Sequence, residues 1–285
     1  MNTLPTNKVV CYYAKLNPNN GWGLKISNES KELVDFWKNN WKEKGWDPVI
    51  LDSSYAKNHP FYTKLYAEYE KGWDESLLFN KRVCHVKDYL LECYTRWLAY
   101  AWFCHENGPV LWCDYDVLNV SFNYDSLPSK CLSDKLLAKS GSVGVMDEDI
   151  STTFISILKG FISSTDYNDV DILNEKQQEH VNQNVNVFSD MIVLQLALID
   201  TLHDHKTHCT DCWEHEIPPG MKFEDYDLFH LHYGATCPVN FSALAFPPPE
   251  KPNFTRLDLT EYVSKLVSST GNNLEKIKNE NSNSR

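Results

Sequence analysis

The chain has 285 residues, a formal net charge of −12 and 42% hydrophobic residues, enough for a sizeable core. The acidic charge argues against a general nucleic-acid binder, which would present a basic face. No apolar run approaches the roughly 18 residues of a membrane helix, and most of the nine cysteines lie in apolar segments, which indicates buried thiols in a reducing compartment. We therefore expect a soluble, cytoplasmic protein with no transmembrane segment and no nucleic-acid partner.

The first fifty residues read as strand, helix, strand. Residues 9–13 predict a strand, and apolar residues recur at helical spacing over 30–44, with Ser30 as N-cap and Gly45 as stop. A second strand follows over 47–51, which is the pattern of a parallel sheet and of a mononucleotide-binding half. Three polar side chains lie at the carboxyl ends of these strands, where a base and a ribose would bind: Tyr12, Tyr13 and Asp52.

The middle of the chain leads from a long helix into a central strand. Residues 53–80 suggest only a short aromatic helix ending near Gly72, whereas residues 83–104 predict a strong amphipathic helix. The apolar run 110–113, preceded by the turn residues Gly108-Pro109, is typical of a buried strand in a parallel sheet.

Beyond the central strand the pattern is less uniform. Residues 143–146 predict another strand, and residues 153–161 fit a helix or a strand equally well. The polar segment 165–184 is expected to be a surface excursion or flexible loop. Residues 191–202 predict a helix, and residues 229–233 a late strand.

An acidic pair, Asp114-Tyr115-Asp116, directly follows the central strand. In an extended chain both carboxylates point to the same side, where they repel unless a positive charge lies between them. A hard divalent cation with oxygen ligands is the usual partner, and the carboxyl end of a parallel strand is where open α/β sheets bind ligands. The alternative is a solvated turn with two capping aspartates.

The run YTRWLAYAWFCHENGPVLWCDYDVLN (94–119) resembles the core signature of GT-A-type glycosyltransferases. The matching features are an Arg followed by an aromatic residue on a helix (Arg96-Trp97), a glycine turn, an apolar strand and the Asp-x-Asp pair. This chain differs in having Gly108-Pro109 where many relatives have Gly-Gly, and Glu92 where many carry Asp.

The resemblance implies a single GT-A-like (Rossmann-type) α/β domain with a mostly parallel central sheet flanked by helices. Residues 1–265 would form this domain, with 1–120 as the nucleotide-binding half and 121–265 as the acceptor half. Residues 266–285 are expected to form a polar, flexible tail.

The resemblance also implies ligands for the acidic pair. Asp114 and Asp116 would bind Mn²⁺ or Mg²⁺, which clamps the diphosphate of a nucleoside-diphosphate sugar. A late histidine would complete the metal site, with His232 as first choice and His230 as second. The resemblance therefore predicts a metal site built from both halves of the domain.

Two further roles follow from the resemblance. Arg96 would contact phosphate oxygens, with a surface ion pair to Glu92 as the alternative. Asp190 is a base or orienting group for an acceptor hydroxyl, or simply a helix cap, and Asp147 is the competing carboxylate. The expected reaction moves a sugar from the nucleoside-diphosphate donor to a hydroxyl on a carbohydrate or protein acceptor.

Two other functions compete with the glycosyltransferase. A haloacid-dehalogenase-like phosphatase also uses Asp-x-Asp after a strand, but that class places the motif at its first strand, and here about 110 residues precede it. A non-catalytic carbohydrate-binding module would also suit the many Trp and Tyr residues.

A Cys/His-rich stretch at 203–215 is a separate candidate metal site. Zn²⁺ favours four nitrogen or sulfur ligands, but a single Cys-x-x-Cys lacks the second separated pair of a zinc finger, so a polar loop is the alternative. The candidate ligands are His203, His205, His208, Cys209, Cys212 and His215.

Overall fold

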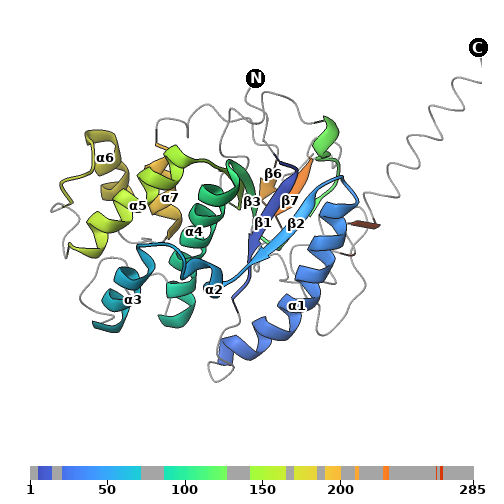
Figure 1. Cartoon of the computed structure of the whole chain (residues 1–285), viewed down its shortest axis with the longest axis horizontal. Helices are drawn as coiled ribbons and strands as arrows, with labels where there is room; N and C mark the ends of the chain where they lie inside the picture. Colours follow the sequence, from blue (N-terminus) through green and yellow to red (C-terminus); the bar gives the residue numbers. More distant parts are fainter. Residues whose placement is uncertain are drawn as a thin grey trace, which may run out of the picture.

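A mixed, mostly parallel four-stranded sheet with helices on both faces organises the computed structural model (Figure 1). The structure describes residues 6–14, 21–71, 87–126, 142–164, 170–184, 190–199, 209–211, 227–230, 261 and 264–265. Within these residues, none of the helices combines the length and apolar character needed to cross a membrane.

The strand order is β2-β1-β3-β5. β1 (Lys8–Tyr12) pairs in parallel with β2 (Asp47–Leu51) on one side and with β3 (Val110–Cys113) on the other. β5 (Val143–Met146) runs antiparallel to β3. The α/β class and the mostly parallel sheet are confirmed, and the carboxyl ends of the three parallel strands share one edge.

Helix α1 (Gly21–Lys42) covers one face of the sheet, where Trp37 and Trp41 pack on the strands. A Schellman motif ends the helix, with Gly45 at a φ of 80°. The Gly45 N–H donates to the Lys42 carbonyl, and the Trp46 N–H donates to the Trp41 carbonyl. The predicted stop is confirmed. The predicted start at residue 30 is wrong, because Ser and Asn cost only about 0.5 kcal/mol each inside a helix and do not end it.

The opposite face carries the larger core. α4 (Lys87–Asn107) and α5 (Glu148–Ile162) pack there around Trp97, whose ring meets Trp112 of β3 edge-on at 5.4 Å and Phe154 at 5.3 Å. Successive side chains of a strand point to opposite faces of the sheet. The side chains of β3 therefore alternate between the core under α4 and α5 and the core under α1.

The second half of the chain is more helical than its sequence pattern predicts. The undecided segment 153–161 belongs to α5, and α6 (Glu175–Asn184) occupies much of the segment expected to be a loop. A capping box begins α6: the Asn174 Oδ1 accepts from the Gln177 N–H, and the Gln177 Oε1 accepts from the Asn174 N–H. The loop prediction is wrong for residues 175–184, because side-chain hydrogen bonds and one buried valine hold a polar helix.

α7 (Asp190–Ala197) is shorter than predicted, since residues 198–199 already form a turn. The Gln177 Nε2 donates to the Leu196 carbonyl at 2.8 Å, which fixes α6 against the end of α7. α7 in turn packs on α5. These contacts place Asp190, at the start of α7, beside α4.

A second, small sheet has the order β4-β7-β6. β4 (Val117–Asn119) pairs antiparallel with β7 (Leu228–His230), which places Val117 opposite His230, and β6 (Cys209–Asp211) pairs with β7 in parallel. A 3₁₀ turn, η2 (Tyr124–Ser126), follows β4. The predicted late strand is confirmed at 229–230, and residues 231–233 lie outside the described residues.

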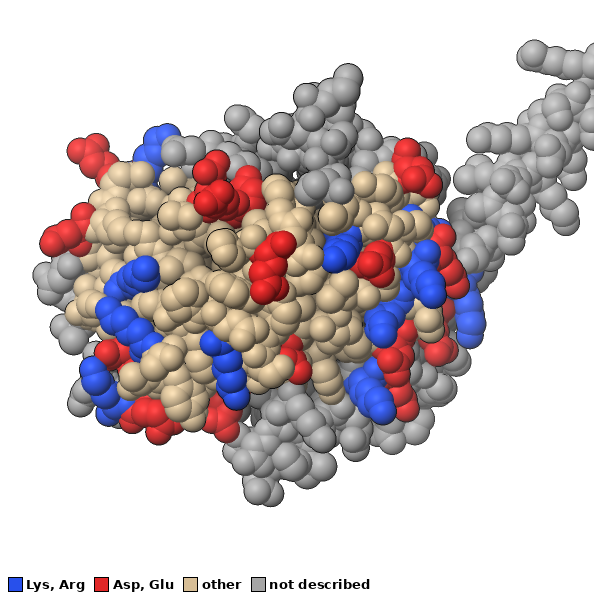
Figure 2. All heavy atoms as spheres, in the orientation of Figure 1, with Lys and Arg blue, Asp and Glu red and all other residues tan. Residues whose placement is uncertain are grey.

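Helix α3 (Tyr62–Lys71) confirms the short aromatic helix predicted to end near Gly72, and α2 (Ser53–Ala56), which was not predicted, lies between β2 and α3. Acidic and basic side chains are interspersed over the face of the molecule shown in Figure 2. That face carries no continuous basic field among its described residues.

The link between α2 and α3 contains a histidine with a perturbed acidity. Burial, together with the positive charges of Lys159 and His105, lowers the pKa of His59 from 6.5 to about 4. Between pH 6.5 and about 4 the unfolded chain therefore binds more protons than the folded chain, so the free energy of unfolding falls as the pH falls through this window. The ring is half-buried, and we expect a loss of about 1–2 kcal/mol.

The measurement is denaturant unfolding at pH 7 and pH 4.5 for the parent protein and for His59→Asn. Asparagine retains an acceptor for the Phe61 N–H, which the His59 Nδ1 accepts at 3.1 Å, but it does not titrate. The variant should lose less stability than the parent between the two pH values. Equal losses would show that His59 is not responsible.

Candidate metal centre

The acidic pair lies in a tight turn where β3 ends. The Asp114 N–H donates to the Ser142 carbonyl at 2.7 Å, and the Val117 N–H donates back to the Asp114 carbonyl at 3.2 Å. The extended geometry expected for the pair is therefore wrong, because the chain must leave the first sheet here to begin β4. The turn still holds both carboxylates at the carboxyl edge of the parallel strands.

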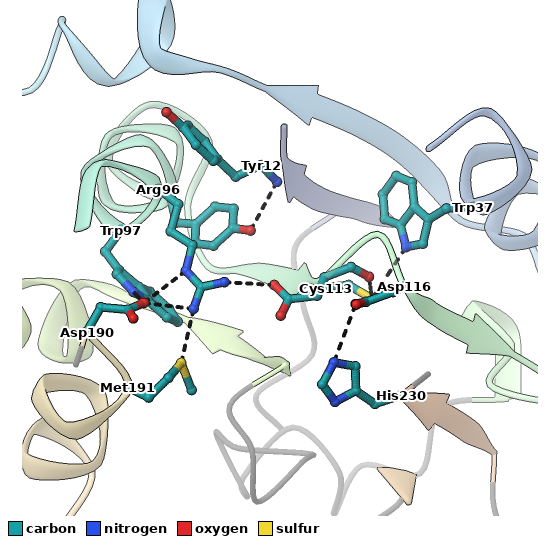
Figure 3. Close-up of polar contacts among 11 residues, drawn as sticks. Tyr12, Trp37, Arg96, Trp97, Cys113, Asp116, Asp190, Met191 and His230 are labelled. Carbon is teal, nitrogen blue, oxygen red and sulfur yellow. Dashed lines mark hydrogen bonds and ion pairs between the residues drawn. The ribbon is translucent and has the colours of Figure 1, made fainter. Parts of the chain in front are cut away.

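Asp114, Asp116 and His230 form the candidate metal centre. One ligand atom from each lies within 4.8 Å of the others, and the Asp116 Oδ1 is 3.4 Å from the His230 Nε2 (Figure 3). The register of β7 against β4 delivers the histidine, since His230 stands opposite Val117. Among the described residues this is the one group of three such side chains close enough to hold a metal ion. Two carboxylates and one imidazole suit a divalent cation such as Mn²⁺.

Arg96 supplies the counter-charge inside the protein. Its Nη1 lies 3.2 Å from the Asp114 Oδ1, and its Nε and Nη2 lie 3.1 and 2.7 Å from the Asp190 Oδ2 (Figure 3). Glu92 instead accepts a hydrogen bond from the Tyr12 hydroxyl. The interpretation of Arg96 as the partner of Glu92 in a surface pair is therefore wrong.

Asp190 joins α7 to α4 through one oxygen. Besides Arg96, the Asp190 Oδ2 accepts a hydrogen bond from the Trp97 Nε1 at 2.7 Å, and the carboxylate is only 5% exposed. The Arg96 Nη2 also lies 3.0 Å from the Met191 sulfur. The carboxylate thus orients the guanidinium that faces Asp114, a role that neither the cap nor the base interpretation foresaw.

The electrostatics of the site favour a cation. The site holds three carboxylates (Asp114, Asp116, Asp190) and one guanidinium, which leaves two formal negative charges when His230 is neutral. Burial raises the pKa of Asp114 to about 6; the Asp116 charge adds to this and Arg96 opposes it. Burial alone would lower the pKa of Arg96, but Asp190 and Asp114 outweigh it and raise that pKa. A divalent cation would neutralise the excess charge.

The residues predicted to bind the nucleotide lie at the same edge of the sheet in different environments. The Tyr12 ring is buried, and its backbone N–H donates to the Tyr100 hydroxyl at 3.1 Å. The Tyr13 ring meets Tyr115 edge-on at 6.0 Å, beside the acidic turn. Asp52 caps α2, accepting from the backbone N–H groups of its first turn. The structure brings Tyr13 nearest to the metal centre.

Asp147 lies at the other edge of the sheet. It follows Met146, which pairs with Val110 at the start of β3, so the length of β3 (about 10 Å) separates it from Asp114. Its carboxylate caps α5 by accepting from the Ile150 N–H at 2.9 Å. The structure does not bring Asp147 together with the acidic pair.

Several candidate ligands lie outside the described residues. These include His232 and five of the six candidate zinc ligands; the sixth, Cys209, is described as a residue of β6. Met191 is a contact of Arg96 that the sequence reasoning missed. Trp97 was named as the aromatic residue that follows Arg96, but its hydrogen bond to Asp190 was not foreseen.

Comparisons with models of known protein families, with curated proteins and with solved structures each find no match to this chain. The geometry of the candidate metal centre is therefore what supports a function.

Proposed function

We propose that this protein is a metal-dependent glycosyltransferase of GT-A-like fold, which moves a sugar from a nucleoside-diphosphate sugar to a hydroxyl acceptor. The observation that carries the proposal is the convergence of Asp114, Asp116 and His230 at the carboxyl edge of parallel strands. That edge is where sheets of this type bind nucleotides. A half-buried arginine next to the group adds a second positive charge, of the kind that stabilises phosphate oxygens.

The residues present fit Mn²⁺ or Mg²⁺. Asp116, His230 and Asp114 would hold the ion, and the nitrogen ligand favours Mn²⁺ over Mg²⁺, which prefers oxygen. The ion would supply charge stabilisation for the departing nucleoside diphosphate. Arg96, fixed by Asp190, holds Asp114 in place and lowers the electrostatic cost of the paired carboxylates.

Aromatic rings near the metal centre offer a surface for the organic parts of the substrates. The Tyr13 and Tyr115 rings stand beside the acidic turn, where they provide aromatic surface for a base or a sugar. A carbohydrate or protein hydroxyl is the proposed acceptor. Asp190 serves as the positioning residue for Arg96, since the oxygen that faces α4 already accepts hydrogen bonds from two side chains.

The test is a thermal-shift panel of nucleoside diphosphates and nucleotide sugars, each with and without Mn²⁺. A ligand that binds only the folded state raises the Tm, so at least one nucleotide should do so in a metal-dependent way. If none does, the proposal fails. Hydrolysis of a simple phosphate ester with Mg²⁺ would favour a phosphatase instead, and saturable oligosaccharide binding without turnover would favour a non-catalytic module.

A further inference from the structure

A buried hydrogen-bond donor without a partner lies on α4, away from the metal centre. The Trp102 Nε1 is inaccessible to solvent and has no acceptor, although the rest of the side chain is half-buried. Buried donors are nearly always satisfied, and an exception calls for an explanation such as a bound water or ion. The missing acceptor is the first indication of a ligand.

The neighbours of this indole are donors too. The Trp102 ring lies 5.1 Å from the His105 ring and 6.5 Å from the His59 ring, measured between centroids. The His59 Nδ1 accepts the Phe61 N–H, so in the neutral imidazole the proton sits on Nε2 and that atom donates. The Lys159 ammonium lies 5.5 Å from the Phe61 ring centroid, next to His59. We call His59, Trp102, His105 and Lys159 the donor cluster.

We propose that the donor cluster is a binding site for a phosphate group, free or as a small phosphate monoester. The cluster offers N–H donors from three elements: the link before α3, the last turns of α4, and α5. A phosphate carries roughly 1.5 to 2 negative charges and three strong acceptor oxygens, which match several neighbouring donors better than a single water does.

The local charge also favours an anion. Burial and the positive charge of Lys159 lower the pKa of His59, so its ring is neutral near pH 7 and Lys159 is the cation beside it. The nearby acid Glu106 accepts a hydrogen bond from the Tyr55 hydroxyl. A divalent metal is a poorer fit, because the indole N–H and the lysine are donors that cannot act as ligands.

The site is separate from the metal centre. Trp102 lies six residues beyond Arg96 on α4, about 9 Å further along the helix axis and about 120° around it. Anion binding at the donor cluster can therefore be measured without any divalent metal.

The experiment titrates phosphate into the metal-free protein by calorimetry, with histidine ring signals followed by NMR. We expect saturable binding that shifts the His59 signals, and about tenfold weaker binding for Lys159→Gln and for Trp102→Phe, each of which removes one charge-assisted donor. Lys38→Gln, an exposed lysine on α1 across the sheet, is the matched control and should bind like the parent.

Glycerol phosphate, sulfate and chloride are titrated into the metal-free protein in the same way. Tighter binding of glycerol phosphate than of phosphate identifies a monoester as the ligand, and the reverse identifies free phosphate. The proposal is overturned if neither phosphate compound binds saturably, if chloride binds as well as phosphate, or if Lys159→Gln binds like the parent. Lys159 is exposed, so its variant tests the site even if Trp102→Phe is unstable.

Discussion

Asp116→Asn is expected to lower the affinity for Mn²⁺ by about 100-fold or more while leaving the protein folded. Changes to groups that merely support metal ligands already cost roughly 10- to 100-fold, and Asp116 is a proposed ligand itself. Its carboxylate is 3.4 Å from the His230 Nε2 and shares the turn with Asp114. Asparagine keeps the shape of the side chain but removes the charge that attracts the cation, and it relieves the repulsion between the two carboxylates.

Calorimetric titration of Mn²⁺ measures the affinity, and circular dichroism checks the fold. Asp35→Asn, which changes an exposed carboxylate on α1, has the same effect on net charge and should bind Mn²⁺ like the parent. An unchanged Mn²⁺ affinity in Asp116→Asn would remove this residue from the site. The same variant should also lose any metal-dependent thermal shift produced by a nucleotide.

The strands of the first sheet were predictable, whereas in the second sheet only β7 was predicted. β1, β2, β3 and β5 are apolar runs bounded by turn residues, and such runs form buried strands whatever lies around them. β4 and β6 have three residues each, too few for a periodic pattern. They exist because their backbones pair with distant segments, which is information that local propensity does not contain.

The site also contains residues that the sequence predicted and contacts that it did not. Asp114 and Asp116 adjoin a recognisable strand, so their position at its carboxyl end followed from the pattern. Arg96 was predicted, but its partner Asp190 lies 94 residues away, and no local pattern links them. The choice between His230 and His232 depended on the register of β7 against β4. The structure places His230 in the group, while His232 lies outside the described residues.

Asp190→Ala is expected to lower the free energy of unfolding by about 3–5 kcal/mol, the usual cost of removing one partner of a buried ion pair. The substitution takes two hydrogen bonds from the Arg96 guanidinium and removes the acceptor of the Trp97 indole N–H. The indole then becomes a buried unsatisfied donor in the centre of the larger core. Asp190→Asn should cost less, because its amide oxygen can still accept from Trp97.

Denaturant unfolding measures these costs, and a double-mutant cycle separates the ion pair from the rest. Arg96→Met alone leaves Asp114 and Asp190 without their counter-charge, whereas Arg96→Met with Asp190→Leu replaces the pair by apolar side chains of similar volume. The double variant should lose less than the sum of Arg96→Met and Asp190→Leu, since neither charge is left alone. Additive losses would mean that the two side chains do not act as a pair.

A different result would support a catalytic role for Asp190. If Asp190→Ala keeps the stability of the parent protein but loses all turnover, the carboxylate acts as a base on the acceptor hydroxyl. The cycle therefore measures whether Asp190 and Arg96 act as a pair, and the turnover of Asp190→Ala tests whether Asp190 reacts with substrate.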